Sequence, residues 1–233
     1  MKKFTIFLFI ISLTYSAKAQ RPNLPGDLLI DFGFSLLSEA PAEVDLGFLG
    51  SRAINIYYLY HIPFGESSNF SINPGIGLGM ENYNFNNGNT LNYTPEGGVE
   101  LIDVETLINS TDFSELRKSK LSANYLDIPV EFRFHANEDD HSRGLNFAVG
   151  GRVGMLIDSH TKIKYVEGGD TKKLKQKEQF GLSRFRFGVH GRLGLGSLSL
   201  FYYHNLSNLF DDNGPEGTET TNSFMAGLSF ALF

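Results

Sequence analysis

Two residues near the C-terminus, a histidine and a serine, are of the types that could together perform nucleophilic catalysis. In the stretch His204-Asn205-Leu206-Ser207-Asn208, His204 could act as a general base and Ser207 as a nucleophile. Side chains three positions apart on a regular strand point to opposite faces, so a proton could pass between them only across a β-bulge. The alternative reading is an interfacial histidine beside Tyr202 and Tyr203, and the spacing favours it.

A larger set of ionisable residues alternates with apolar ones. The stretch Tyr125 to His135 reads Y-L-D-I-P-V-E-F-R-F-H, which puts apolar residues on one face of a strand and Asp127, Glu131, Arg133 and His135 on the other. The same charged parity, followed through the other alternating stretches, holds five acids and five arginines: Asp31, Glu81, Asp127, Glu131, Asp158, Arg133, Arg152, Arg184, Arg186 and Arg192. Arginine suits paired, buried carboxylates, so this balance predicts ion pairs rather than catalysis.

These charges need strands to position them, and the alternation recurs eight times. The predicted strands cover residues 28–36, 54–62, 70–81, 125–135, 145–158, 184–195, 198–206 and 224–232. The connections between them run alternately long and short, which is typical of an outer-membrane barrel with both termini in the periplasm. We therefore predict an all-β fold, an eight-stranded antiparallel transmembrane β-barrel with long extracellular loops. The alternative is a periplasmic lipocalin-like barrel, whose interior would need to be apolar.

The size of such a barrel restricts what its interior can do. Eight strands enclose a space that side chains fill, and buried charges are tolerated there only when they pair. The sequence therefore predicts a salt-bridged, plugged lumen rather than an open pore, with inward glycines making room for the arginines: Gly75, Gly77, Gly79, Gly150 and Gly154. The histidines lack metal-ligand spacing, and we expect no catalytic, metal or cofactor site.

The N-terminus predicts the compartment. Residues 1–19 have a basic start, an apolar run of about a dozen residues, too short to span a bilayer as a helix, and an Ala17-Lys18-Ala19 cleavage site, which indicates a secretory signal. Residues 20–26 are a periplasmic lead-in, and residues 27–233 form the barrel. The chain has no cysteine and a net charge of −6, which argues against nucleic acid as a partner. We expect an integral protein of the cell outer membrane.

Two long connections carry the remaining hypotheses. Residues 82–124 are acidic yet hold several apolar side chains, and 112–120 could form a short helix capped by Asp112. Residues 159–180 predict a projecting hairpin that turns at Gly168-Gly169-Asp170 and carries six lysines: Lys162, Lys164, Lys172, Lys173, Lys175 and Lys177. We expect the first loop to fold onto this hairpin and dock on another outer-membrane protein. The lysines are either a solvated surface or a site that meets lipopolysaccharide phosphates, the acidic loop or a partner.

The whole mature chain resembles a known family. The signal peptide, the eight-strand layout, the Y-L-D-I-P-V-E-F-R-F stretch preceded by Lys118-Ser119-Lys120-Leu121 and the aromatic C-terminal strand are similar to the PorT-like outer-membrane β-barrels of Bacteroidetes. One departure is that Phe233 falls on the inward parity, whereas the usual C-terminal signal places the final aromatic toward lipid. The resemblance implies a non-enzymatic structural or accessory subunit, with a role related to secretion for some members. The alternative is a lipid A-modifying enzyme, since His204 and Ser207 resemble the H-x-S-N of lipid A deacylases.

Overall fold

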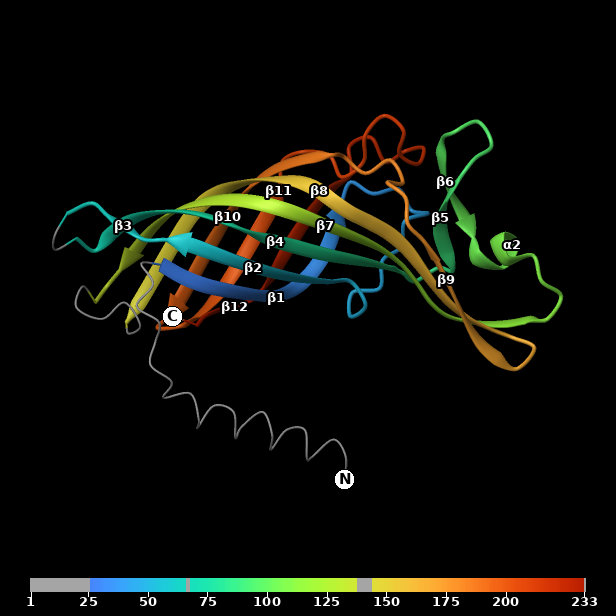
Figure 1. Cartoon of the computed structure of the whole chain (residues 1–233), viewed down its shortest axis with the longest axis horizontal. Helices are drawn as coiled ribbons and strands as arrows, with labels where there is room; N and C mark the ends of the chain where they lie inside the picture. The colour runs from blue at the N-terminus through green and yellow to red at the C-terminus, as the bar shows by residue number, and fades with distance from the viewer. Residues whose placement is uncertain (1–25, 66–67, 138–143, 233) are drawn as a thin grey trace, which may run out of the picture.

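Eight long antiparallel strands form a closed barrel, as the alternation predicts (Figure 1). The computed structural model describes residues 26–65, 68–137 and 144–232, so the predicted signal peptide, most of the lead-in and Phe233 lie outside it. Each barrel strand pairs with the next along the chain, and the pairing of the last strand with the first closes the circle. Their bounds are β1 (Gly26–Ser38), β2 (Arg52–Tyr60), β4 (Phe70–Phe85), β7 (Phe113–His135), β8 (Leu145–Glu167), β10 (Phe185–Leu195), β11 (Leu198–Asn205) and β12 (Asn222–Ala231).

The remaining elements decorate the two ends of the barrel. β3 (Ile62–Pro63) pairs with the start of β4, and β9 (Asp170–Gln176) pairs with the end of β8. β5 (Asn89–Tyr93) and β6 (Val99–Asp103) form a separate two-stranded sheet, followed by the short helix α2 (Val104–Ile108). Within the described ranges, no helix is long and apolar enough to cross a membrane.

The outer wall of the barrel is apolar on every strand. Outward side chains such as Phe32, Ile128 and Phe187 are about half exposed, and the same parity on the other strands carries Ile54, Leu78, Val153, Leu200 and Leu228. A water-soluble protein rarely exposes a continuous apolar surface of this extent, whereas a barrel in a membrane turns such a band toward lipid. The inward parity is instead polar and buried, so the strands bury their charged face.

The two ends of the barrel differ, which confirms the alternation of the connections. One end, at the left of Figure 1, carries the C-terminus, β3 and the tight β10–β11 turn at residues 196–197. The opposite end carries β5, β6, α2 and β9, together with the connections 39–51 and 206–221. We call these the short-turn end and the long-loop end.

The structure corrects the predicted extent of the first long connection. β4 continues to Phe85 and β7 starts at Phe113, so the connection between them is residues 86–112 rather than 82–124. The predicted helix at 112–120 is wrong, because residues from Phe113 onward pair with the extended end of β8. A long-range ladder therefore overrides a weak local helix signal. The only helical segment in the described connection is α2, capped by Asp103, whose carboxylate accepts hydrogen bonds from the Glu105 and Thr106 amides.

The predicted hairpin at residues 159–180 is confirmed in its turn and its projection. β8 and β9 pair from Thr161 and Gln176 up to Glu167 and Asp170, and Gly168 and Gly169 between them have positive φ angles of 57° and 85°. Those angles suit a two-residue hairpin turn that glycine adopts without steric cost. The ends of β7, β8 and β9 thus form a three-stranded ribbon beyond the barrel, at the lower right of Figure 1.

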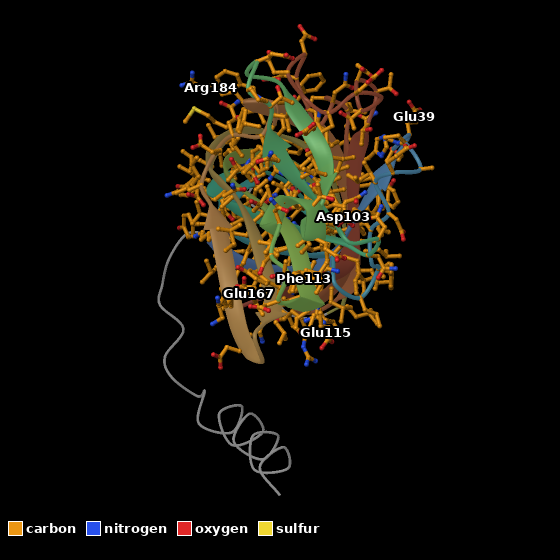
Figure 2. The ribbon with its side chains drawn as sticks, turned by 90° about the vertical axis from the view of Figure 1, so that its right-hand side faces the viewer. Glu39, Asp103, Phe113, Glu115, Glu167 and Arg184 are labelled. Carbon is orange, nitrogen blue, oxygen red and sulfur yellow. The ribbon has the colours of Figure 1, made fainter. Side chains whose placement is uncertain are left out.

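Residues 86–112 fold over the mouth of the barrel, and we call them the hood. Leu91 of β5 and Val99 of β6 are buried in one apolar cluster with inward residues of the barrel strands, among them Leu121 and Tyr125. The Tyr93 ring stacks on Phe180, which follows the hairpin, and its hydroxyl accepts a hydrogen bond from the Phe180 amide at 3.0 Å. The expected contact between the two long connections is therefore present. Figure 2 looks onto this end, with Asp103 of the hood and Glu167 of the ribbon labelled.

Candidate functional site

The lumen is organised around Arg186 of β10. Its guanidinium forms an ion pair with Glu81 of β4 and lies 2.8 Å from the Asp127 carboxylate of β7, which it also reaches through Nε at 3.1 Å. The Arg186 guanidinium also lies 3.8 Å from the centre of the Tyr125 ring. Three strands that are far apart in the sequence are thus joined by one side chain with its donors directed at two carboxylates, an arrangement that arginine favours.

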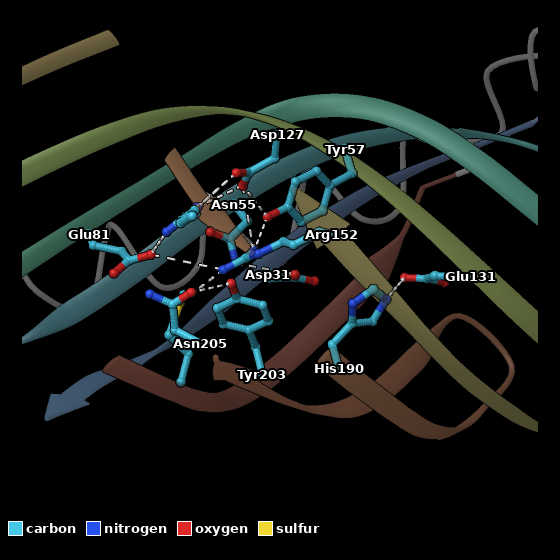
Figure 3. Close-up of polar contacts among 12 residues, drawn as sticks. Asp31, Asn55, Tyr57, Glu81, Asp127, Glu131, Arg152, His190, Tyr203 and Asn205 are labelled. Carbon is cyan, nitrogen blue, oxygen red and sulfur yellow. Dashed lines mark hydrogen bonds and ion pairs between the residues drawn. The ribbon is translucent and has the colours of Figure 1, made fainter. Parts of the chain in front are cut away.

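Arg152 of β8 supports the same two acids. It lies 3.6 Å from Asp127 and 3.9 Å from Glu81, and it donates a hydrogen bond to the Tyr57 hydroxyl. Tyr57 in turn donates to Asp127 at 2.9 Å, and the Arg152 guanidinium lies 3.5 Å from the centre of the Tyr203 ring (Figure 3). The hydrogen bonds of the Tyr57 hydroxyl and the contact with the Tyr203 ring therefore replace interactions with water that these buried charges have lost.

A second group of charges surrounds Glu131 of β7, toward the short-turn end. Arg133 and Arg192 each place Nε within hydrogen-bond distance of its carboxylate, at 2.8 and 2.9 Å, and His190 lies 3.0 Å away. Arg192 continues to Asp31 of β1 at 2.7 Å, and Arg133 also pairs with Asp27. The lumen therefore carries two groups of ion pairs, one around Arg186 and one around Glu131, and each joins strands from different parts of the wall.

Glycines on the inward parity make room for these side chains. A Cβ on Gly79 would lie 2.3 Å from Arg186 Nη2, and one on Gly154 would lie 2.2 Å from Asp127 Oδ1. The expected role of these two glycines is thus borne out by the contacts. The cavity left beside Arg152, His190 and Arg192 has a volume of about 10 Å³, roughly what a single water molecule needs. The lumen is packed with side chains.

Eight of the ten predicted residues lie in this network, four acids and four arginines, each less than a tenth exposed: Asp31, Glu81, Asp127, Glu131, Arg133, Arg152, Arg186 and Arg192. The other two predictions, Asp158 and Arg184, are wrong. Asn124 of β7 pairs with Asp158 and Tyr125 with Leu156, so Ile157 is a β-bulge that reverses the parity of β8. Asp158 therefore faces outward, where it pairs with Lys177 at 2.7 Å and His160 at 3.2 Å.

Arg184 precedes the first residue of β10 and is exposed on the outer surface. It lines a surface cleft with Ile157, Asp158 and Lys177. The hydrogen bond from Lys177 holds the pKa of Asp158 below its ordinary value, while partial burial opposes this effect. Burial lowers the pKa of His160, with Lys175 adding to the effect and Asp158 opposing it. These charges belong to the outer wall rather than to the lumen.

Sequence reasoning missed Asp27 and most of the tyrosines. Asp27 lies on the inward parity of β1, but it precedes the apolar run that marks that strand. Tyr83 of β4, which donates to Glu81, lies beyond the predicted end of its strand. Tyr203 lies on the inward parity of β11 and donates to Asn205 at 3.1 Å. Strict extension of each parity to the strand ends would have found all three.

The structure does not bring His204 and Ser207 together. The His204 ring points outward and contacts the Tyr202 hydroxyl at 3.4 Å, whereas the Ser207 hydroxyl donates to Asn205 on the inward parity at 3.1 Å. Ser207 also accepts from the Phe187 amide at 3.2 Å. The two side chains thus have separate partners on opposite faces of the wall. Among the described residues, no group of three or more His, Cys, Asp or Glu side chains could hold a metal ion.

The fold and the ion-paired lumen define an integral β-barrel of the outer-membrane type. Its apolar outer wall faces lipid, and its inner charges compensate one another. Residues 32–211 match the family model described as outer membrane protein beta-barrel domain, and the chain belongs to that family. The protein is therefore an outer-membrane β-barrel protein.

Solved structures that are similar to this chain include two of Ail, the attachment invasion locus protein of Yersinia pestis. One matches at 13% identity and a TM-score of 0.36, and the other, a complex with the heparin analogue sucrose octasulfate, at 12% and 0.37. Both matches cover 89% of this chain and 97% of the other. A mutant porin of Rhodopseudomonas blastica matches at 8% identity and a TM-score of 0.21, covering 89% of this chain and 99% of the porin. A search of curated proteins gave no match.

Proposed function

We propose that this barrel is a non-enzymatic accessory subunit of a larger outer-membrane assembly, which it contacts through the hood. The resemblance to PorT-like barrels adds the expectation that the assembly is related to secretion. The observation that carries the proposal is the closed lumen beneath a folded hood. The charged lumen side chains are buried, and the cavity beside Arg152 and Arg192 has a volume of only about 10 Å³. This packing supports a function carried by the exposed hood and outer wall.

The hood has the properties of a docking surface. It is anchored from below by Leu91 and Val99, so its outer face is held in one position on the barrel. Residues 86–112 contain five acids and no lysine or arginine: Glu96, Glu100, Asp103, Glu105 and Asp112. Loops of this length that fold are commonly functional, and a surface of one charge favours a partner of the opposite charge. We expect a partner with a basic extracellular surface.

Affinity isolation from detergent-solubilised membranes of the native host tests this proposal. Glu96 and Glu105 are exposed and take no part in the apolar anchor, so Glu96→Gln with Glu105→Gln changes charge and leaves the hood folded. We expect this double variant to recover the partner at least fivefold less well than the parent. The matched control is Asp212→Asn with Glu216→Gln, on the neighbouring connection, which should recover it normally.

Two results would contradict the proposal. The first is equal recovery of every co-purifying protein by the hood variant and the control. The second is a steady, large conductance of the purified protein in planar bilayers, since an open lumen would make transport the better assignment.

A further inference from the structure

Six lysines form two rows on the outer face of the ribbon of β7, β8 and β9. The register places Lys120, Lys162 and Lys175 side by side in one row, and Lys118, Lys164 and Lys173 in the next. Residues directly opposite one another on neighbouring strands share a face, with Cβ atoms about 5 Å apart, and the two rows are about 7 Å apart along the strands. Lys118 and Lys120, which come from β7, were not among the lysines that the sequence grouped with the hairpin.

Within the described residues, these six lysines form no ion pairs, unlike the arginines of the lumen, and Lys120 donates a hydrogen bond to the neutral Asn82 side chain. In the described part of the ribbon and the residues that follow it, the lysines that form ion pairs are Lys172, with Glu167, and Lys177, with Asp158. Like charges directly opposite on a sheet are destabilising. Burial lowers the pKa of Lys120, and the neighbouring Lys118, Lys162 and Lys175 lower it further. A multivalent anion would relieve this repulsion.

The rows continue the lipid-facing wall. On the same parity toward the barrel, β7 presents Leu126 and Ile128, and β8 presents Met155 and the bulged Ile157, which is 52% exposed. From Leu126 to Lys120 the strand rises by about 20 Å, which corresponds to about 15 Å of height for a strand tilted by about 40°. This height exceeds the few ångströms of a phospholipid head group above the hydrocarbon core. The height is that of a charged saccharide carried by a larger lipid.

We propose that the two lysine rows bind the phosphate groups of a lipopolysaccharide in the outer leaflet, whose acyl chains lie against the apolar wall of β7 and β8. The exposed Arg184 and the ion pairs of Asp158 with Lys177 and His160 border the site on its membrane side. Lysine ammonium groups are flexible point charges, which suits several phosphates of variable position better than one rigid site. Because acyl chains can also contact the apolar wall below, a lipid should bind this site with higher affinity than a soluble anion of the same charge.

Binding of a rough-type lipopolysaccharide to the purified full-length barrel in detergent tests the proposal. The variant carries Lys162→Gln, Lys164→Gln and Lys175→Gln. The matched control carries Arg52→Gln, Arg117→Gln and Lys172→Gln, which remove three positive charges outside the rows. A lysine near an anionic surface contributes about a fivefold gain in affinity, so the variant should bind about 100-fold more weakly. The control should change affinity less than threefold.

Additional measurements separate the ligand sources. The same lipopolysaccharide after removal of its phosphates should bind the parent as weakly as the intact form binds the variant. Inorganic phosphate and heparin, which have no acyl chains, should not displace the lipid at millimolar concentration; displacement by either would overturn the proposal in favour of a soluble-anion site. Equal losses in variant and control would also overturn it. If the triple variant fails to fold, the single exposed substitution Lys175→Gln should still weaken binding about fivefold, and an unchanged affinity would refute the proposal.

Discussion

Removal of Arg186 should destabilise the barrel more than removal of any other single arginine among its described residues. In Arg186→Met, the carboxylates of Glu81 and Asp127 remain fully buried and lose their shortest ion pairs. Arg152, at 3.9 and 3.6 Å, then has to compensate both acids alone. Loss of one partner from a buried ion pair costs about 3–5 kcal/mol, mainly because it leaves an uncompensated charge out of water.

Two other substitutions calibrate this value. Arg152→Met leaves both acids paired with Arg186 and chiefly removes a hydrogen bond to Tyr57, so we expect a loss of about 1–3 kcal/mol. Arg117→Ala breaks an ion pair with Glu115 at 2.8 Å in which both side chains are about half exposed. Such a surface pair contributes about 0–1 kcal/mol.

Urea unfolding in lipid vesicles, followed by circular dichroism because the chain has no tryptophan, measures the three free energies of unfolding. The double variant Arg186→Met, Glu81→Gln removes one charge of each sign and leaves Arg152 paired with Asp127, so it should recover part of the loss. A stability of Arg186→Met within about 1 kcal/mol of the parent would refute the reasoning. So would a double variant that is less stable than the single one, because it would show that lost packing, not unpaired charge, sets the cost.

Three further predictions follow from other contacts. Gly154→Ala should cost about 1–3 kcal/mol, because its Cβ would lie 2.2 Å from Asp127 Oδ1, whereas Gly151→Ala on the outer face of the same strand should be nearly neutral in the same unfolding assay. The hydrogen bond from Lys177 lowers the pKa of Asp158 in the folded state. The carboxylate therefore stabilises the protein above its unfolded pKa of about 4, and this contribution is lost as the pH falls through the lower folded pKa. Asp158→Asn should show a smaller acid destabilisation in urea titrations from pH 6 to 3. A single cysteine at Gly169 should react with a membrane-impermeant maleimide on intact cells, and one at Ser197 should react only after the outer membrane is permeabilised; the opposite pattern would reverse the topology.

Alternation was sufficient to predict the barrel and most of its lumen, because side-chain period fixes the face of each residue within a regular strand. It failed at Asp158, where one bulged residue, Ile157, reverses the parity, and a bulge has no reliable sequence signal. It also failed at residues 112–120, where local signals suggested a helix and pairing with β8 decided the outcome. The hood was predicted as a contact between loops, but its sheet of β5 and β6 depends on long-range packing against Leu121 and Tyr125.

The bulge at Ile157 also separates a part of β8 with buried inward charges from a part with exposed outward charges. On the barrel side of Ile157, inward charges must be paired within the protein, because neither lipid nor a filled lumen offers water. Beyond it, the parity is reversed. The inward face is uncharged, with Ser159, Thr161 and Ile163 buried, and the charges of β8 appear on the outer face. There the lysines are exposed to water and to the membrane surface, so they tolerate incomplete pairing and remain available to an external anion. A variant that deletes Ile157 would remove the bulge, and Asp158 would then directly follow the inward Leu156. The observed register and the outward placement of Asp158, His160 and Lys162 would be kept. We therefore expect both this deletion and Ile157→Leu to fold, as judged by heat-modifiable migration on gels. Loss of that migration in the deletion variant alone would show that the bulge itself is required.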